Sequence, residues 1–320
     1  MLDFIINENI IRNKGFPLKQ QNMEYQTQYY CIAEHYIGIS FIAQQVNLLK
    51  LIPSLNPFRC EKPSNNKELL AKLFIDNTLQ PIDKSKCELI RNFDTGNGMT
   101  LVDRLPNGGY QYIIHNIKEE QCCLLQTDKD FQNCKCAISG DNNMQNFGLN
   151  NALMLIYAFA SSKKDTLLIH ASLVRNNGYG YAFIAKSGTG KSTQVSMWLR
   201  YIKGSDLMND DNPIIRIING ALYIYGSPWS GKTPCYRNIK AKLGAITHID
   251  RAQKNSIEKL STINAFAALM PSCSTMKWDE TITDYICHTI EQLIATTGIY
   301  TLHCLPNQEA AEICYNTIAK

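Results

Sequence analysis

The sequence contains no long run of apolar residues and no amino-terminal targeting pattern. Nowhere in its 320 residues is there a stretch that approaches the about 18 apolar residues of a membrane-spanning helix. Asp3 and Glu8 lie where a secretory signal would have basic residues, and no long apolar segment follows them. We therefore expect a cytoplasmic protein that has no membrane as its partner.

A cluster of basic residues is missing as well. The 32 Lys and Arg residues nearly balance the 28 Asp and Glu residues, and the formal net charge is +4. Proteins that bind duplex nucleic acid usually gather Lys and Arg on one face. The sequence therefore predicts no nucleic-acid partner.

Cysteines are numerous, but none has the spacing of a metal site. Of the 12 cysteines, Cys122 and Cys123 are adjacent, Cys134 and Cys136 are one residue apart, and no pair has the Cys-x-x-Cys spacing. Zinc sites normally show such pairs, and a disulfide framework is typical of secreted chains. We expect reduced thiols that bind no metal.

The overall composition is that of an ordinary globular protein. Hydrophobic residues make up 45% and charged residues 19% of a chain long enough for two domains. The first half reads as β-rich, with a long β segment at residues 29–43, in which Gly38 suggests a bulge, and another strand at 122–126. Residues 101–105 and 110–114 flank Pro106-Asn107-Gly108-Gly109, which predicts a hairpin.

The second half alternates between strand and helix patterns. Polar residues 140–146 read as a loop and 150–160 as a buried helix, which puts the predicted domain boundary near residue 148. We expect strands at 167–174, 181–184, 213–218 and 221–225, the last two joined by an Asn-Gly turn, and helices at 191–202, 265–270, 281–297 and 309–319. The predicted fold class is mixed α/β, with a β-rich domain at 1–148 and a nucleotide-binding domain at 149–320.

A glycine-rich segment between a predicted strand and a predicted helix carries the most information. It reads Ala185-Lys186-Ser187-Gly188-Thr189-Gly190-Lys191-Ser192-Thr193. Glycines let backbone N–H groups converge on phosphate oxygens, and the following helix N-terminus adds partial positive charge. In such a loop the lysine reaches the β- and γ-phosphates and the hydroxyl after it ligates Mg²⁺. We expect ATP and Mg²⁺ as ligands, with these phosphate-binding residues: Ser187, Gly188, Thr189, Gly190, Lys191, Ser192 and Thr193.

Three further features accompany this loop. His170 lies fifteen residues before it, within a predicted strand. After the helix, the apolar pair Leu207-Met208 leads to the adjacent carboxylates Asp210 and Asp211. Residues 225–233 then form a second candidate loop at the same site. A solvated turn is the alternative interpretation of the two acids, since Asn and Pro follow them.

The order of a His-x-Ser segment, the phosphate-binding loop and an Asp-Asp pair resembles two related families. These are the phosphoenolpyruvate carboxykinases and the catalytic domain of HPr kinase/phosphorylase, and the resemblance covers about residues 165–235. It implies a carboxykinase-like P-loop domain, with Asp210 as the general base, Asp211 on the Mg²⁺ side together with Ser192, and His170 beside the metal and the phosphates. Lys191, His170 and Asp210 are then the expected catalytic residues.

The chain departs from HPr kinase/phosphorylase in one place. That family has a Glu that helps to hold Mg²⁺ and a nearby Arg, whereas the corresponding segment here contains Tyr223 and Tyr225. The reverse, phosphorolytic reaction is therefore not expected. Lys232, near the end of the second loop, and Arg237, after it, are candidates to supply charge in place of the missing Glu and Arg, or are simply an exposed basic pair.

These observations together predict an ATP-dependent kinase, an HPr kinase-like phosphotransferase. The expected acceptor is a serine or another hydroxyl, on a peptide, on a protein or as a free serine-like molecule, and the domain at 1–148 would recognise it. A carboxykinase-like enzyme acting on a small organic acid is one alternative, and a non-catalytic nucleotide-binding sensor is another. The sequence leaves the formation of a homo-oligomer open.

Overall fold

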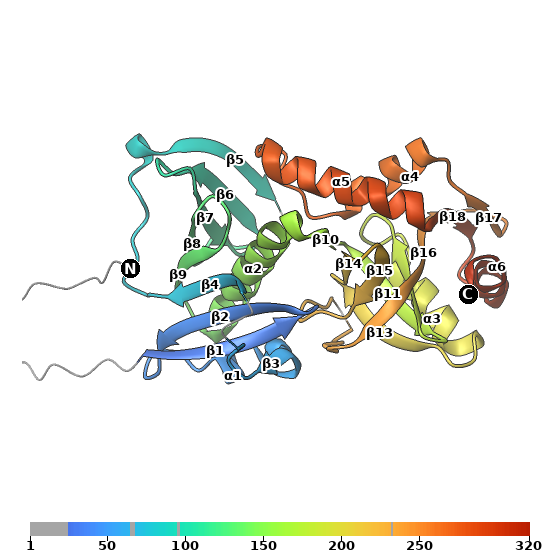
Figure 1. Cartoon of the computed structure of the whole chain (residues 1–320), viewed down its shortest axis with the longest axis horizontal. Coiled ribbons are helices and arrows are strands. Elements are labelled where there is room, and N and C mark those ends of the chain that lie inside the picture. The colour runs from blue at the N-terminus through green and yellow to red at the C-terminus, as the bar shows by residue number, and fades with distance from the viewer. Residues whose placement is uncertain (1–24, 65–67, 95–96, 232) are drawn as a thin grey trace, which may run out of the picture.

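The structure is a computed structural model that describes residues 25–64, 68–94, 97–231 and 233–320. Its architecture is mixed α/β, with two large β-sheets side by side and helices between and around them (Figure 1). The predicted fold class is confirmed at this level. Within the described ranges, no helix is both long enough and apolar enough to cross a membrane.

The first sheet is built from the β-rich first half of the chain. Its strands are β1 (Tyr25–Ile32), β2 (His35–Ile42), β3 (Arg59–Cys60), β4 (Leu69–Ile75), β5 (Glu88–Asp94), β6 (Met99–Arg104), β7 (Tyr110–His115), β8 (Gln121–Thr127) and β9 (Asn133–Ile138). They follow the order β3-β1-β2-β4-β9-β8-β7-β6-β5, in which β4 pairs in parallel with both β2 and β9. The predicted hairpin is confirmed as β6 and β7, and Gly108 at φ 81° forms part of its turn.

The second sheet is built from the second half. Its strands are β10 (Thr166–Leu168), β11 (Ala171–Asn176), β12 (Tyr179–Ile184), β13 (Asp206–Asp211), β14 (Ile214–Ile218), β15 (Ala221–Tyr225), β16 (Lys240–Arg251), β17 (Ser256–Lys259) and β18 (Gly298–Cys304). The long strand β16 pairs in parallel with β12 on one side and with β18 on the other. The Asn219-Gly220 turn between β14 and β15 has φ values of 50° and 76°, as its sequence predicts.

Helices cover these sheets and connect them. They are α1 (Leu48–Leu51), α2 (Asn142–Ser161), α3 (Lys191–Tyr201), α4 (Thr262–Leu269), α5 (Glu280–Thr296) and α6 (Gln308–Ile318), with 3-10 turns at Pro53–Phe58, Lys84–Lys86, Ser162–Lys164 and Met270–Ser272. The long helix α2 packs against β8, β9 and β4 of the first sheet and against β10 of the second (Figure 1). Helices α3 and α6 pack together over a smaller apolar core, at whose centre lies the buried Trp198.

The loop expected at residues 140–146 is wrong in detail. Residues 140–146 are not a loop throughout, because Asp141 caps α2 by accepting hydrogen bonds from the backbone N–H groups of Asn143 and Met144, both at 2.9 Å. The predicted boundary near residue 148 therefore falls inside a helix. One continuous hydrophobic core also includes side chains from both sheets.

The segment at 29–43 turns back on itself instead of bulging at Gly38. Ala33 and Glu34 adopt φ values of 46° and 65°, and they join β1 to β2 as a tight hairpin. Contacts with the second sheet hold this unusual turn: Arg216 donates to the Ala33 carbonyl at 2.6 Å, and Lys240 pairs with Glu34 at 2.7 Å. Sequence patterning missed the turn because long-range contacts, and not Gly or Asn, stabilise it.

Candidate functional site

The glycine-rich loop connects β12 to α3 in the manner that its sequence predicts. Gly188 and Gly190 have φ values of 77° and 135°, a backbone region in which a side chain would be strained. Gly190 is the N-cap of α3, and no side chain caps this helix. The first N–H groups of α3 therefore lack a side-chain acceptor, which is the arrangement that binds phosphate at a helix N-terminus.

Lys191 is folded back over its own loop. Its side chain is buried, and its Nζ lies 3.1 Å from the Ala185 carbonyl oxygen and 2.8 Å from Nε2 of His170. Burial lowers the pKa of Lys191 from its ordinary value, and the negative charges of Asp211 and Asp210 oppose that shift. The site thus holds a desolvated cation beside two carboxylates.

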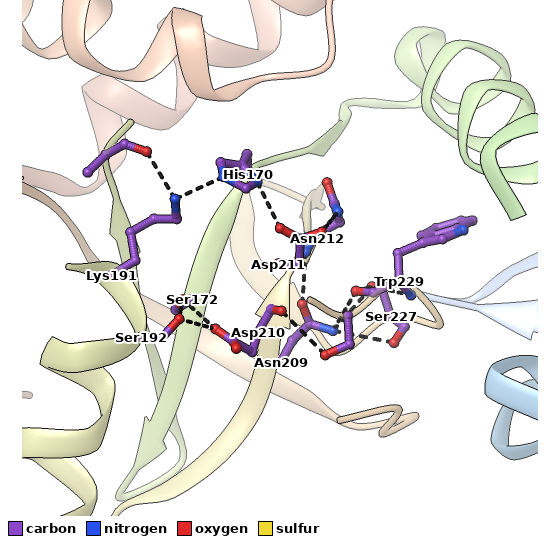
Figure 2. A network of polar contacts seen from close by, with 12 residues as sticks. His170, Ser172, Lys191, Ser192, Asn209, Asp210, Asp211, Asn212, Ser227 and Trp229 are labelled. Carbon is purple, nitrogen blue, oxygen red and sulfur yellow. Dashed lines mark hydrogen bonds and ion pairs between the residues drawn. The ribbon is translucent and has the colours of Figure 1, made fainter. Parts of the chain in front are cut away.

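His170 lies in a break between two strands. The strand predicted at 167–174 is interrupted, since β10 ends at Leu168 and β11 begins at Ala171. The backbone N–H of His170 instead donates to the Ser272 carbonyl at 2.6 Å. This break turns the imidazole toward the loop, where Nδ1 lies 3.0 Å from Oδ1 of Asp211 and Nε2 faces Lys191 (Figure 2).

The two contacts of His170 define its tautomer. A lysine ammonium can only donate, so Nε2 must accept the hydrogen bond from Lys191. The proton of a neutral imidazole is then on Nδ1, from which it is donated to the Asp211 carboxylate. Lys191, His170 and Asp211 therefore form one polar chain across the site.

Asp210 belongs to a different group of side chains. It is 5% exposed, and its Oδ1 accepts hydrogen bonds from Ser172 at 2.6 Å and from Ser192 at 2.9 Å. The two hydroxyl oxygens are 3.3 Å apart (Figure 2). Ser172 is opposite Asp210 in the β11–β13 pairing, so the sheet register creates this contact. Sequence reasoning gave Ser172 no role, although it lies two residues after His170.

This second group offers the oxygen donors that Mg²⁺ prefers. Among the residues that the structure describes, no group of three or more His, Cys, Asp and Glu side chains is placed to hold a metal. A nucleotide-bound Mg²⁺ does not need one, because it takes one or two carboxylates, while phosphate oxygens and water complete its coordination. Asp210 and Ser192 fit that requirement, whereas Asp211, the predicted metal-side acid, contacts His170.

A buried asparagine fixes the second loop beside the acids. Asn209 is fully buried, and its Nδ2 lies 3.2 Å from both the Ser227 hydroxyl and the Trp229 carbonyl oxygen. The backbone N–H of Gly231 in turn donates to the Asp210 carbonyl at 2.5 Å. The structure therefore places residues 227–231 against the acid pair, as the sequence order suggested. Asn209 itself was missed, and its position directly before the acids was the available signal.

The two basic residues predicted after this loop have different outcomes. Lys232 lies outside the described residues. Arg237 pairs with Asp206 at 2.7 Å and also donates to the Leu207 carbonyl. Asp206 begins β13, four residues before Asp210, which is about 13 Å along an extended strand. Arg237 thus forms an ion pair at the end of β13 that is remote from Asp210 and Asp211. It is therefore no longer a candidate phosphate-binding residue.

Comparison with known proteins adds no assignment. The chain matches no protein-family model and no curated protein.

Proposed function

We propose that this protein is an ATP-dependent kinase that resembles HPr kinase/phosphorylase and carboxykinases in its P-loop region. It transfers the terminal phosphoryl group to a serine or another hydroxyl, on a peptide or protein or on a free serine-like molecule. The observation that carries the proposal is the convergence of Lys191, the Ser192–Asp210 pair and the Asp211–His170 pair around an uncapped helix N-terminus.

The loop and α3 bind the phosphates. Backbone N–H groups of the loop and of the first turn of α3 donate to the β- and γ-phosphate oxygens. Lys191 already lies at the site, and a rotation of its side chain from His170 to a phosphate oxygen exchanges a neutral acceptor for an anionic one. The anionic phosphate oxygen stabilises the charged form of the Lys191 side chain. It thereby offsets the burial that lowers the pKa of this lysine.

Ser192 and Asp210 would hold Mg²⁺. When bound, the metal supplies charge neutralisation across the phosphates. Ser172 donates to the same carboxylate oxygen as Ser192, and thereby fixes the orientation of Asp210. Because the Asp210 carboxylate is buried between two hydroxyls, it has little access to an acceptor molecule.

The remaining pair is better placed to take the proton of the acceptor hydroxyl. Once Lys191 has moved to the phosphates, the Nε2 lone pair of His170 is free, while Nδ1–H remains bonded to Asp211. The acceptor oxygen attacks the γ-phosphorus, its proton passes to Nε2, and ADP is the leaving group. Asp211 orients the imidazole and stabilises its charge. The family resemblance made Asp210 the base and Asp211 the metal-side acid; here Asp210 takes the metal side, and His170, oriented by Asp211, is the base.

The first sheet is the proposed acceptor-recognition part. Trp229 of the second loop packs against Tyr157 of α2, with ring centroids 5.4 Å apart, and α2 packs on the first sheet. Residues next to the acid pair are thus in direct contact with the element that joins the two sheets. An acceptor bound to the first sheet could in this way be positioned relative to His170.

An ATP-consumption assay across acceptor classes tests the proposal. The full chain is incubated with Mg·ATP and, in separate reactions, serine, hydroxyl-bearing peptides or small organic acids, and products are identified by mass spectrometry. The proposal expects a phosphorylated hydroxyl compound and ADP. Nucleotide binding without turnover on any acceptor would indicate a sensor, and turnover on an organic acid alone would indicate a carboxykinase-like enzyme.

A further inference from the structure

The end of β16 extends beyond the strand that leads into the phosphate-binding loop. In the parallel pairing of β12 with β16, Ile184, the last residue of β12, is opposite His248. Strand β16 continues for three more residues, about 10 Å, to Arg251. Pairing with β18 supports this extension, since Ile249 is opposite Leu302 and Arg251 is opposite Cys304. A rigid strand end therefore stands beside the loop.

Alternate residues of this strand end face the loop. The Cγ2 atom of Ile249 is 4.0 Å from the position that a Cβ of Gly190 would occupy. Arg251, two residues further and thus on the same face, donates from Nε to the Thr189 carbonyl at 2.9 Å and from Nη2 to the Gly188 carbonyl at 2.5 Å. One guanidinium thereby holds two successive peptide carbonyls of the loop.

These two hydrogen bonds determine where the adjoining N–H groups point. A trans peptide is planar, and its C=O and N–H bonds point in opposite directions. With the carbonyls of Gly188 and Thr189 directed to Arg251, the N–H groups of Thr189 and Gly190 must point away from it. The Thr189 N–H points in this direction and donates to the Lys186 carbonyl oxygen at 3.2 Å, so Arg251 and Lys186 together fix this peptide and with it the direction of the Gly190 N–H that follows.

We propose that Arg251 is a positioning residue of the nucleotide site, which pre-orients the loop amides for the phosphates of ATP. This inference rests on the proposed function. Arg251 acts from the carbonyl side of the loop, so its effect depends on the forked geometry of the guanidinium and not on its charge alone. A lysine at this position keeps the charge but cannot bond both carbonyls with the same fixed geometry.

The test compares Arg251→Ala, Arg251→Lys and the control Lys254→Ala, which removes a nearby exposed positive charge. Calorimetry measures Mg·ATP affinity, and hydrogen exchange without nucleotide measures the amides of residues 186–190. Two lost charge-assisted hydrogen bonds at an exposed site should weaken binding roughly tenfold in Arg251→Ala. Arg251→Lys should recover only part of this loss, and both Arg251 variants should exchange the loop amides faster than the wild-type protein.

The two readouts separate this inference from the proposed function. If the wild-type protein binds Mg·ATP and Arg251→Ala matches Lys254→Ala in affinity, the inference is overturned while the proposed function stands. Full recovery of affinity by Arg251→Lys would assign the effect to the positive charge and would overturn the positioning role of Arg251. Hydrogen exchange at residues 186–190 that is the same in the Arg251 variants and the wild-type protein would overturn that role as well. If the wild-type protein does not bind Mg·ATP, the proposed function fails, and with it the role assigned to Arg251.

Discussion

Asp210 and Asp211 are consecutive residues of β13, yet their carboxylates contact different groups. Asp210 accepts hydrogen bonds from the hydroxyls of Ser172 and Ser192, whereas Asp211 contacts the imidazole of His170. Neighbouring side chains of a strand point to opposite faces, and here the two faces meet different elements. The paired acids therefore belong to two separate groups of side chains, which under the proposed function would hold the metal and orient the base.

Replacing Lys191 by alanine should abolish turnover and weaken Mg·ATP binding at least tenfold, since it removes the cation nearest to the phosphates. Calorimetry and the ATP-consumption assay measure the two effects. Lys203→Ala, which removes an exposed lysine just after α3, is the matched control and should behave as the wild-type protein. Unchanged nucleotide affinity in Lys191→Ala would refute the assignment of the loop.

Asp210→Asn and Asp211→Asn should have different effects, and each variant is the control for the other. Asp210→Asn should raise the Mg²⁺ concentration that gives half-maximal activity by roughly tenfold, because a metal ligand loses its charge. Asp211→Asn should leave that concentration nearly unchanged and lower the turnover rate by roughly 10²-fold, because the imidazole loses the group that orients it.

A magnesium titration of kcat and of nucleotide affinity separates these cases. If the two effects are found on the opposite residues, the family-based roles of Asp210 as base and Asp211 as metal-side acid are restored. If both variants turn over at the wild-type rate, the two acids have no part in catalysis.

If the proposed kinase function is correct, transfer should run forward, without appreciable phosphorylase activity. By the resemblance proposed from the sequence, Tyr223 and Tyr225 stand where HPr kinase/phosphorylase has its Glu and Arg. The Lys240 ammonium lies 3.9 Å from the Tyr223 ring centroid. Burial raises the pKa of Tyr225 to about 12, so its phenol carries no charge at neutral pH. Incubating the phosphorylated acceptor with enzyme, Mg²⁺ and excess phosphate tests this prediction. Rapid release of pyrophosphate would contradict it.

Acid should destabilise the fold through His35. This side chain is buried at the start of β2, with its Nε2 3.2 Å from the Thr166 hydroxyl, and burial, aided by the charges of Arg216 and Lys164, lowers its pKa to about 3. The unfolded chain binds a proton at this histidine below about pH 6.5, whereas the folded chain does not. The stability that the buried, neutral His35 side chain contributes is therefore fully present above pH 6.5 and is lost as the pH falls toward 3.

Urea unfolding at pH 7.5 and pH 5 measures this effect. The wild-type protein should lose about 2 kcal/mol at His35 between these two values, in addition to any loss at other groups. The glutamine of His35→Gln cannot titrate, so the stability loss of this variant over the same pH range should be smaller than that of the wild-type protein by about 2 kcal/mol. His288→Gln, at a more exposed histidine on α5, serves as the control. Equal pH dependence in the wild-type protein and His35→Gln would show that the buried histidine does not titrate as expected.

Features that depend on neighbouring residues were predictable from the sequence. The strand–loop–helix unit from β12 to α3 needs only an apolar run, glycines with positive φ and helical spacing after them, all within about twenty residues. The β14–β15 hairpin follows from its Asn219-Gly220 turn. Helices α4, α5 and α6 also begin and end within three residues of their predicted bounds, because an amphipathic period is a local property.

Strands whose pairing partners are remote were missed. Neither β16 nor β18 was predicted, although β16 lies at the centre of the second sheet and pairs with segments about 60 residues before it and 50 residues after it. The turn at Ala33 and Glu34 was missed for the same reason, since Arg216 and Lys240 hold it from the other sheet. Such pairings depend on the whole chain, and residue patterns within a short window do not specify them.

Residue order alone pointed to the side chains of the candidate site: Lys191, Ser192, His170 and the two aspartates. Which of these side chains contact one another follows from the pairing of strands that are distant in the sequence. The register of β11 with β13 puts Ser172 opposite Asp210, and the strand break at His170 turns the imidazole to Asp211. The parallel pairing of β16 brings Arg251 to a loop that precedes it by about sixty residues. Residue type is a property of one position, whereas direction and proximity arise only when distant strands pair.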